Sequence, residues 1–124
     1  MANIIAVDDS PSMRQLVSMT LSNAGHEVHL AEDGLGAIEL ANSIKADLVI
    51  TDVHMPNMDG IALTKQLRQL PDYRYKPILV LTTESSSEMK RLGKNAGATG
   101  WIVKPFNPDS LLAVLDRVLE PKRS

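Results

Sequence analysis

Four short apolar runs of this 124-residue chain each end in a polar side chain. The side chains that follow the runs are Asp8 and Asp9, then Asp52, Thr82 and Lys104. Each run has the length and the β-branched or apolar character of a buried strand. Because the carboxyl ends of parallel strands meet at one edge of a sheet, these polar groups are expected to converge there.

The charges of such a cluster indicate its chemistry. Two carboxylates about 5 Å apart repel by about 3 kcal/mol at an effective dielectric of about 20, so protons or a cation must relieve the three. Oxygen ligands without histidine or sulfur favour a hard divalent cation, with Mg²⁺ as first choice and Mn²⁺ as second. Lys104 adds a mobile positive charge that can pair with an anion. A cation, a lysine and the Thr82 hydroxyl around one carboxylate make a phosphoryl-transfer site with Asp52 as the nucleophile.

Each residue also has an ordinary explanation. Asp8 and Asp9 could favour the start of the helix that follows them, because a helix N-terminus attracts negative charge. Asp52 could cap a turn, and Lys104 could be a solvated charge. One polar residue at one strand end carries little weight, whereas all four strand ends together are improbable by chance. We therefore interpret the cluster as a functional site.

The elements that position these groups alternate between strands and helices. Strands are expected at 3–7, 27–31, 47–52, 77–82 and 99–103. Helices are expected from Pro11 to Gly25, from Leu35 to Ile44 and from Gly60 or Ile61 to Pro71. Two more are expected, one capped by Ser85-Ser86-Ser87 and carrying Met89, Leu92 and Ala96, and one capped by Asn107-Pro108-Asp109 and ended by Pro121. This alternation predicts an α/β fold, a single-domain doubly wound parallel sheet of five strands with five helices.

Three details of this pattern are less regular. Val28 and Leu30 alternate with polar residues, as in an edge strand with one buried side. Residues 73–76 are predicted to form a polar loop. The helix capped by Ser85-Ser86-Ser87 is expected to be the least stable element, because Gly93 in its interior costs about 1 kcal/mol.

Composition excludes several classes of protein. The chain has no cysteine, which excludes disulfides and thiolate nucleophiles, and its net charge of −2 with interspersed signs gives no nucleic-acid footprint. No apolar run is long enough to span a membrane, and the N-terminus does not have the pattern of a signal peptide. We expect a cytoplasmic monomer. His26 and His29 are expected at the surface rather than in a metal site.

Five motifs also carry a family resemblance over residues 4 to about 119. They are Val7-Asp8-Asp9-Ser10, residues 52–60, Leu81-Thr82-Thr83-Glu84, Ala96-Gly97-Ala98 and Lys104-Pro105-Phe106. Together they resemble the receiver domain of bacterial two-component response regulators, most of all the CheY-like single-domain chemotaxis response regulators. The resemblance implies one receiver domain over residues 1–124 and the flavodoxin-like strand order 2-1-3-4-5.

The resemblance also implies roles for single residues. Asp52 takes a phosphoryl group from a kinase phosphohistidine. Asp9, Asp52 and the backbone carbonyl of His54 bind Mg²⁺, and Asp8 assists through water. Thr82 and Lys104 contact the phosphoryl oxygens.

Further implied features surround this centre. Trp101 occupies the position of a switch aromatic that is usually tyrosine or phenylalanine, and the Lys104–Pro105 bond is expected to be cis. His54 and Glu84 hold positions that tune hydrolysis. Thr83 stands where alanine or glycine is common.

The expected function is a phosphorylation-activated signalling switch that catalyses only its own phosphorylation and dephosphorylation. The implied partners are a chemotaxis-type histidine kinase, a flagellar motor switch protein or another adaptor, and a phosphatase. Two alternatives stay open: a stand-alone receiver acting as a phosphate sink or adaptor regulator, and a Mg²⁺-dependent phosphohydrolase with an aspartyl intermediate. In such hydrolases a second acid usually stands at the position of His54.

Overall fold

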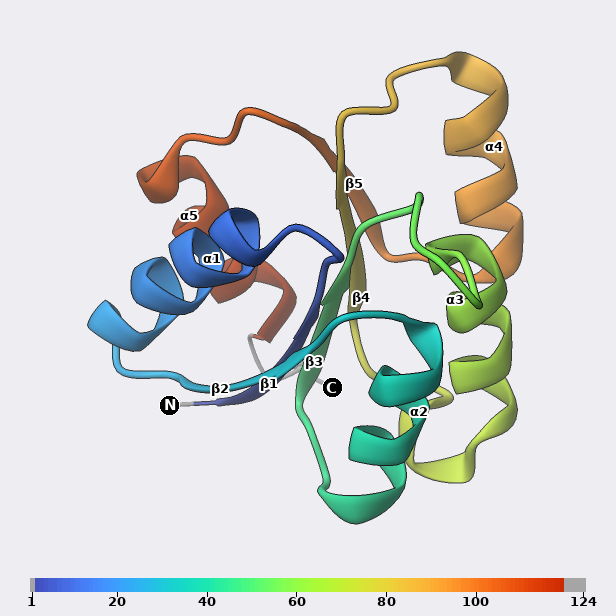
Figure 1. The fold of residues 1–124 in the computed structure, drawn as a ribbon, viewed down its shortest axis with the longest axis horizontal. Coiled ribbons are helices and arrows are strands. Elements are labelled where there is room, and N and C mark those ends of the chain that lie inside the picture. The colour runs from blue at the N-terminus through green and yellow to red at the C-terminus, as the bar shows by residue number, and fades with distance from the viewer. Residues whose placement is uncertain (1, 120–124) are drawn as a thin grey trace.

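A parallel sheet of five strands organises the computed structural model, which describes residues 2–119. The strands are β1 (Asn3–Val7), β2 (Glu27–Ala31), β3 (Leu48–Thr51), β4 (Ile78–Thr82) and β5 (Gly100–Val103), in the order β2-β1-β3-β4-β5. The helices are α1 (Pro11–Asn23), α2 (Gly34–Ser43), α3 (Gly60–Gln69), α4 (Ser87–Ala96) and α5 (Pro108–Leu119). Helices α1 and α5 cover one face of the sheet, and α2, α3 and α4 lie on the other side (Figure 1). The predicted fold class and strand order are confirmed.

Side-chain caps set where the helices begin. Ser10 accepts a hydrogen bond from the amide of Met13 and caps α1, as predicted, and Pro11 is the first helical residue. Gly97 ends α4 with a φ of 108°, a left-handed conformation that favours glycine. The predicted end of α5 at Pro121 lies outside the described residues.

None of the helices within residues 2–119 combines the length and apolar character needed to cross a bilayer.

The sheet separates two apolar cores. The core on the α1–α5 side contains residues from those helices and from the central strands. Its fully buried members include Ile4, Leu21, Leu79, Leu111 and Leu115. The other core lies between the sheet, α2 and α3, and includes Ile5, Val49, Leu63 and Leu67. Because both faces are covered, β3 and β4 are buried along their whole length, which explains their uninterrupted apolar sequences.

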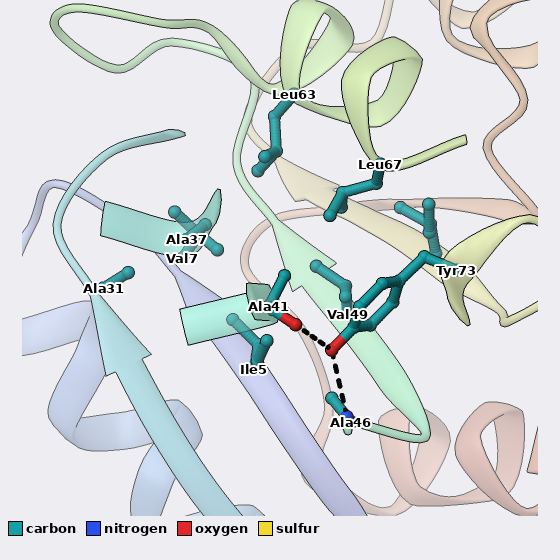
Figure 2. Packing of buried hydrophobic residues seen from close by; sticks show 11 residues of the cluster. Ile5, Val7, Ala31, Ala37, Ala41, Ala46, Val49, Leu63, Leu67 and Tyr73 are labelled. Atoms are coloured by element: carbon teal, nitrogen blue, oxygen red, sulfur yellow. Dashed lines mark hydrogen bonds between the residues drawn. The ribbon is translucent and has the colours of Figure 1, made fainter. Parts of the chain in front are cut away.

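The predicted polar loop at residues 73–76 is wrong at its first residue. Tyr73 ends a short 3₁₀ helix, η1 (Pro71–Tyr73), and its side chain is 1% exposed. Its hydroxyl accepts a hydrogen bond from the amide of Ala46 (3.1 Å) and lies within hydrogen-bonding distance of the Ala41 carbonyl (3.1 Å) (Figure 2). The Ile44 carbonyl is also within hydrogen-bonding distance of it (2.9 Å). Three polar neighbours justify a buried tyrosine, and short-range sequence patterns cannot reveal them.

One other residue differs from expectation, and Gly93 has a role that was not predicted. Leu30 is 42% exposed rather than inward-facing, although β2 is an edge strand as predicted. Gly93 is buried because the Trp101 ring packs against it, and a Cβ there would lie 2.6 Å from Cζ3 of that ring. The glycine that weakens α4 as an isolated helix therefore makes room for its main aromatic contact.

Candidate functional site

Three carboxylates meet at the carboxyl edge of the sheet. Val7 pairs with Thr51 in the β1–β3 ladder, so Asp8 and Asp52 follow at neighbouring strand ends. Asp8, Asp9 and Asp52 each offer one oxygen, and these oxygens lie within 4.8 Å of one another. Asp8 is buried, Asp52 is half-buried and Asp9 is exposed. The convergence predicted from the strand ends is present.

Lys104 reaches into this cluster from the end of β5. Its Nζ atom lies 2.7 Å from Oδ2 of Asp8 and 2.9 Å from Oδ2 of Asp52. The lysine side chain is 8% exposed, so both ion pairs are shielded from water. The peptide bond between Lys104 and Pro105 is cis, as expected. The ammonium group neutralises one of the three negative charges.

The charges in the site depend on opposing effects. Burial raises the pKa of Asp52, but hydrogen bonds from Lys104 and Thr82, the positive charge of Lys104 and the Val53 amide together lower that pKa below 3.8. Burial lowers the pKa of Lys104, but its hydrogen bonds and charge interactions with Asp52 and Asp8 raise it above 10.5. Both groups are therefore ionised at neutral pH, and Asp52 is an anionic carboxylate.

The β3–α3 loop, residues 53–59, begins directly after Asp52. Its ends are joined by a hydrogen bond from the Gly60 amide to the Val53 carbonyl (2.8 Å). A Cβ at position 60 would lie 1.9 Å from the Asp52 carbonyl oxygen, so only glycine fits there. Asn57 has a φ of 69°, in the left-handed region. The conformation of this loop therefore depends on the absence of a side chain at Gly60 and on the left-handed backbone at Asn57.

A second set of contacts connects the end of β4 to β5. The Thr82 hydroxyl is fully buried and accepts a hydrogen bond from the Glu84 amide (3.3 Å). The Trp101 indole donates to the Glu84 carbonyl (2.9 Å). His54 Nε2 lies 2.9 Å from Oε2 of Glu84 on the exposed side. All eight predicted site residues thus lie in one connected region: Asp8, Asp9, Asp52, His54, Thr82, Glu84, Trp101 and Lys104.

Three further residues hold this region together, and no local sequence pattern singled them out: Arg14, Asp33 and Asn57. Arg14 donates to the Asp8 carbonyl (2.7 Å) and lies 3.7 Å from Glu32. Asn57 Nδ2 donates to Oδ2 of Asp33 (2.7 Å). These partners are distant in sequence, and only the positive φ preferred by asparagine and glycine hinted at the turn around Asn57.

The residues present fit a divalent cation. Three carboxylates against one ammonium leave an excess of negative charge, and all the clustered donors are oxygens. Asp9 is exposed and has no ion-pair partner among the described residues, so it can take up a ligand from solvent. Hard oxygen donors of this kind suit Mg²⁺.

Comparison with known proteins agrees with this geometry. Residues 4–116 match the model of the response regulator receiver domain. The protein PilH of Pseudomonas aeruginosa is 34% identical over 96% of this chain and 98% of its own length. The chain spans about half, 50%, of a mycobacterial response regulator, MprA, at 39% identity.

Solved structures give the same result. The chemotaxis protein CheY4 of Vibrio cholerae is 52% identical, with a TM-score of 0.92 over 95% of this chain and 98% of the other. The receiver domain of the sensor histidine kinase PA1611 of P. aeruginosa, solved with a magnesium ion in its active-site cleft, is 27% identical, with a TM-score of 0.89 over 95% of this chain and 97% of the other. The family match, the CheY-like fold and the acidic cluster lead to one conclusion: this chain belongs to the response regulator receiver domain family.

Proposed function

We propose that Asp52 accepts a phosphoryl group from the phosphohistidine of a histidine kinase, and that this modification switches the affinity of the chain for a partner. The observation that carries the proposal is the placement of Lys104, whose ammonium group bridges Asp52 and Asp8 beside the open carboxylate of Asp9. This arrangement supplies an ionised nucleophile, a positive charge and free oxygen ligands at one point.

The phosphoryl group moves from an imidazole nitrogen of the phosphohistidine to a carboxylate oxygen of Asp52. An oxygen of Asp52 forms a bond to phosphorus while the bond between phosphorus and the imidazole nitrogen breaks. The imidazole leaves with the electron pair and takes a proton from solvent, and Asp52 becomes an acyl phosphate. The signal ends by hydrolysis, in which water attacks phosphorus and releases inorganic phosphate and the Asp52 carboxylate. Lys104 exchanges one of its carboxylate contacts for a phosphoryl oxygen.

Asp9, Asp52 and the backbone carbonyl of His54 would hold Mg²⁺, with Asp8 assisting through water. The bound cation supplies charge neutralisation at the phosphoryl oxygens. Mn²⁺ offers the same charge and accepts the same oxygen ligands. Among the residues of the chain, Asp8 keeps Lys104 in place, and Val53 orients the Asp52 carboxylate through its amide (2.6 Å).

The switch would act through contacts that begin at Thr82. A shift of the Thr82 hydroxyl towards the phosphoryl group would disturb its contact with Glu84, whose carbonyl holds the Trp101 indole. Trp101 would then turn inward and alter the face formed by α4, β5 and α5. Changing such a switch from mostly off to mostly on requires about 5 kcal/mol of differential stabilisation, which a few charge-assisted hydrogen bonds can supply.

The biological setting is proposed from relatives. The 52% identity to a protein named for chemotaxis supports a role in that system, with a chemotaxis-type histidine kinase upstream, a flagellar motor switch protein or other adaptor downstream, and a phosphatase acting on the acyl phosphate. Membership of the receiver family favours a switch, with residues 1–124 as one receiver domain, over a phosphohydrolase. A phosphate-sink role uses the same chemistry and differs only in lacking an output partner.

The test is intact-mass analysis after incubation with Mg²⁺ and a small phosphodonor. The wild-type chain should gain one phosphoryl group, and Asp52→Asn should gain none because its amide is not a nucleophile. Asp59→Asn is the matched control, since asparagine also caps α3 and Asp59 lies at the far end of the same loop. A phosphoryl gain by Asp52→Asn equal to that of the wild type would contradict the assignment of the nucleophile.

A further inference from the structure

The β3–α3 loop is tied to the turn before α2 by one pair of side chains. Nδ2 of Asn57 donates to Oδ2 of Asp33 at 2.7 Å, while Oδ1 of Asp33 accepts from the Gly36 amide at 2.9 Å and caps α2. Hydrogen bonds from Gly36 and Asn57 lower the pKa of Asp33, so the carboxylate is ionised at neutral pH. We name the Asp33–Asn57 pair the loop clasp.

The backbone at Asn57 needs such a tie. Its φ of 69° is uncommon for residues with a Cβ, although asparagine adopts it more readily than most, and the Met58 amide donates to the Pro56 carbonyl (2.7 Å) across this single residue. Backbone conformations of this kind persist when surrounding contacts fix them. Asn57 is exposed, so burial does not fix it, and the contact with Asp33 is its only side-chain hydrogen bond among the described residues.

Packing reinforces the clasp at the next residue. The Met58 side chain lies over Gly34, where a built Cβ would be 2.7 Å from Cβ of Met58. On the opposite side, His54 contacts Glu84, and the base of the loop is closed between Val53 and Gly60. The clasp is therefore the polar contact that holds the loop on its α2 side.

We propose that Asp33 and Asn57 are positioning residues that keep the β3–α3 loop in the conformation required for Mg²⁺ binding. The inference rests on the proposed function, in which the His54 carbonyl of this loop contacts the cation. A loop already held in its binding conformation loses less conformational freedom when the cation binds, so the free chain binds more tightly. Neither residue touches the cation.

The experiment is calorimetric titration of the full chain with Mg²⁺ alone. Asn57→Gly removes the clasp and keeps the left-handed backbone available. We expect its dissociation constant for Mg²⁺ to rise about 3- to 10-fold. This is no more than the lower end of the roughly 10- to 100-fold loss that is typical when a group that supports a metal ligand is changed. In phosphorylation by a small donor, the Mg²⁺ concentration that gives half of the maximal rate should rise by the same factor. Hydrogen exchange at residues 54–58 without metal should become faster.

Two further variants distinguish the effect of the Asp33–Asn57 hydrogen bond on Mg²⁺ affinity from the effect of negative charge near the site. Asp33→Asn keeps the α2 cap and can still hydrogen-bond Asn57 after rotation of one amide, so its Mg²⁺ affinity should stay close to the wild-type value. Glu32→Gln removes the same charge from the adjacent residue and leaves both the clasp and the hydrogen bond from Arg14 to the Asp8 carbonyl in place, since the 3.7 Å contact of Glu32 with Arg14 is solvent-exposed and weak. It corrects the Asp33→Asn value for lost electrostatic attraction.

Unchanged Mg²⁺ affinity in Asn57→Gly would overturn the clasp while leaving the proposed function intact. A loss in Asp33→Asn as large as that in Asn57→Gly, after subtraction of the loss in Glu32→Gln, would also overturn it, because the hydrogen bond that Asp33→Asn retains would then not preserve Mg²⁺ binding. Absence of Mg²⁺ binding by the wild-type chain would instead overturn the proposed metal site itself.

Discussion

Burial and Lys104 act in opposite directions on the Asp52 carboxyl. Burial raises its pKa, and the hydrogen bonds from Lys104 and Thr82 more than reverse that effect. Because the pKa in the folded chain lies below the unfolded value, the ionised carboxylate stabilises the fold above the unfolded pKa. This contribution is lost as pH falls through the folded pKa. The raised pKa of Lys104 has the converse effect, with a contribution lost as pH rises above 10.5 through the folded value.

This balance gives a prediction for Lys104→Met. The substitution keeps an unbranched side chain and removes the charge and the hydrogen bonds, so burial should dominate and the pKa of Asp52 should rise above that of the wild type. The measurement is a carbon-13 NMR titration of the Asp52 carboxyl in the presence of a chelator. A pKa equal to that of the wild type would show that Lys104 does not set the charge state of Asp52.

At the scale of elements, Tyr73 links η1 to the connection between α2 and β3. In Tyr73→Phe the ring still fills the core, but the buried Ala46 amide loses its acceptor. We expect a loss of about 1–3 kcal/mol in the free energy of unfolding, the range for an unsatisfied buried polar group. Urea unfolding followed by circular dichroism measures it. A loss well below this range would mean that water replaces the hydroxyl.

The elements themselves could largely be predicted from sequence, because apolar periodicity and capping residues are local signals. Ser10 with Pro11 marked the start of α1, and the apolar runs marked β1, β3 and β4. The pattern failed at Tyr73, since one aromatic in a polar stretch gives no indication of three hydrogen-bonding partners elsewhere in the chain. The pattern also could not show that Gly93, which weakens α4 locally, makes room for a residue on another element.

At the scale of the whole molecule, cation binding and folding are linked. The three carboxylates come together only in the folded chain, so Mg²⁺ should bind the folded state selectively. At a concentration 100 times the dissociation constant, Mg²⁺ should raise the free energy of unfolding by about 2.7 kcal/mol. Urea unfolding with Mg²⁺ and with a chelator measures this difference, and Asp9→Asn should show a smaller one. No Mg²⁺ dependence in the wild-type chain would contradict the metal site.

The whole-molecule arrangement was predicted in two parts. Alternation of strands and helices predicted the parallel sheet, and the placement of Asp8, Asp52 and Lys104 at strand ends predicted the site. The order β2-β1-β3-β4-β5 came from family resemblance, because local patterns do not encode which strands become neighbours. For the same reason Arg14, Asp33 and Asn57 were missed, since their partners become adjacent only once that order is established.

The contact between Gly93 and Trp101 has an evolutionary consequence. With tryptophan at position 101, almost any side chain at position 93 collides with the indole ring, so the helix-favouring change Gly93→Ala is blocked. Replacement of Trp101 by a smaller aromatic would remove the collision and open position 93 to substitution. The two positions are therefore epistatic, and descendants of this sequence can improve α4 at position 93 only after the ring at position 101 has changed.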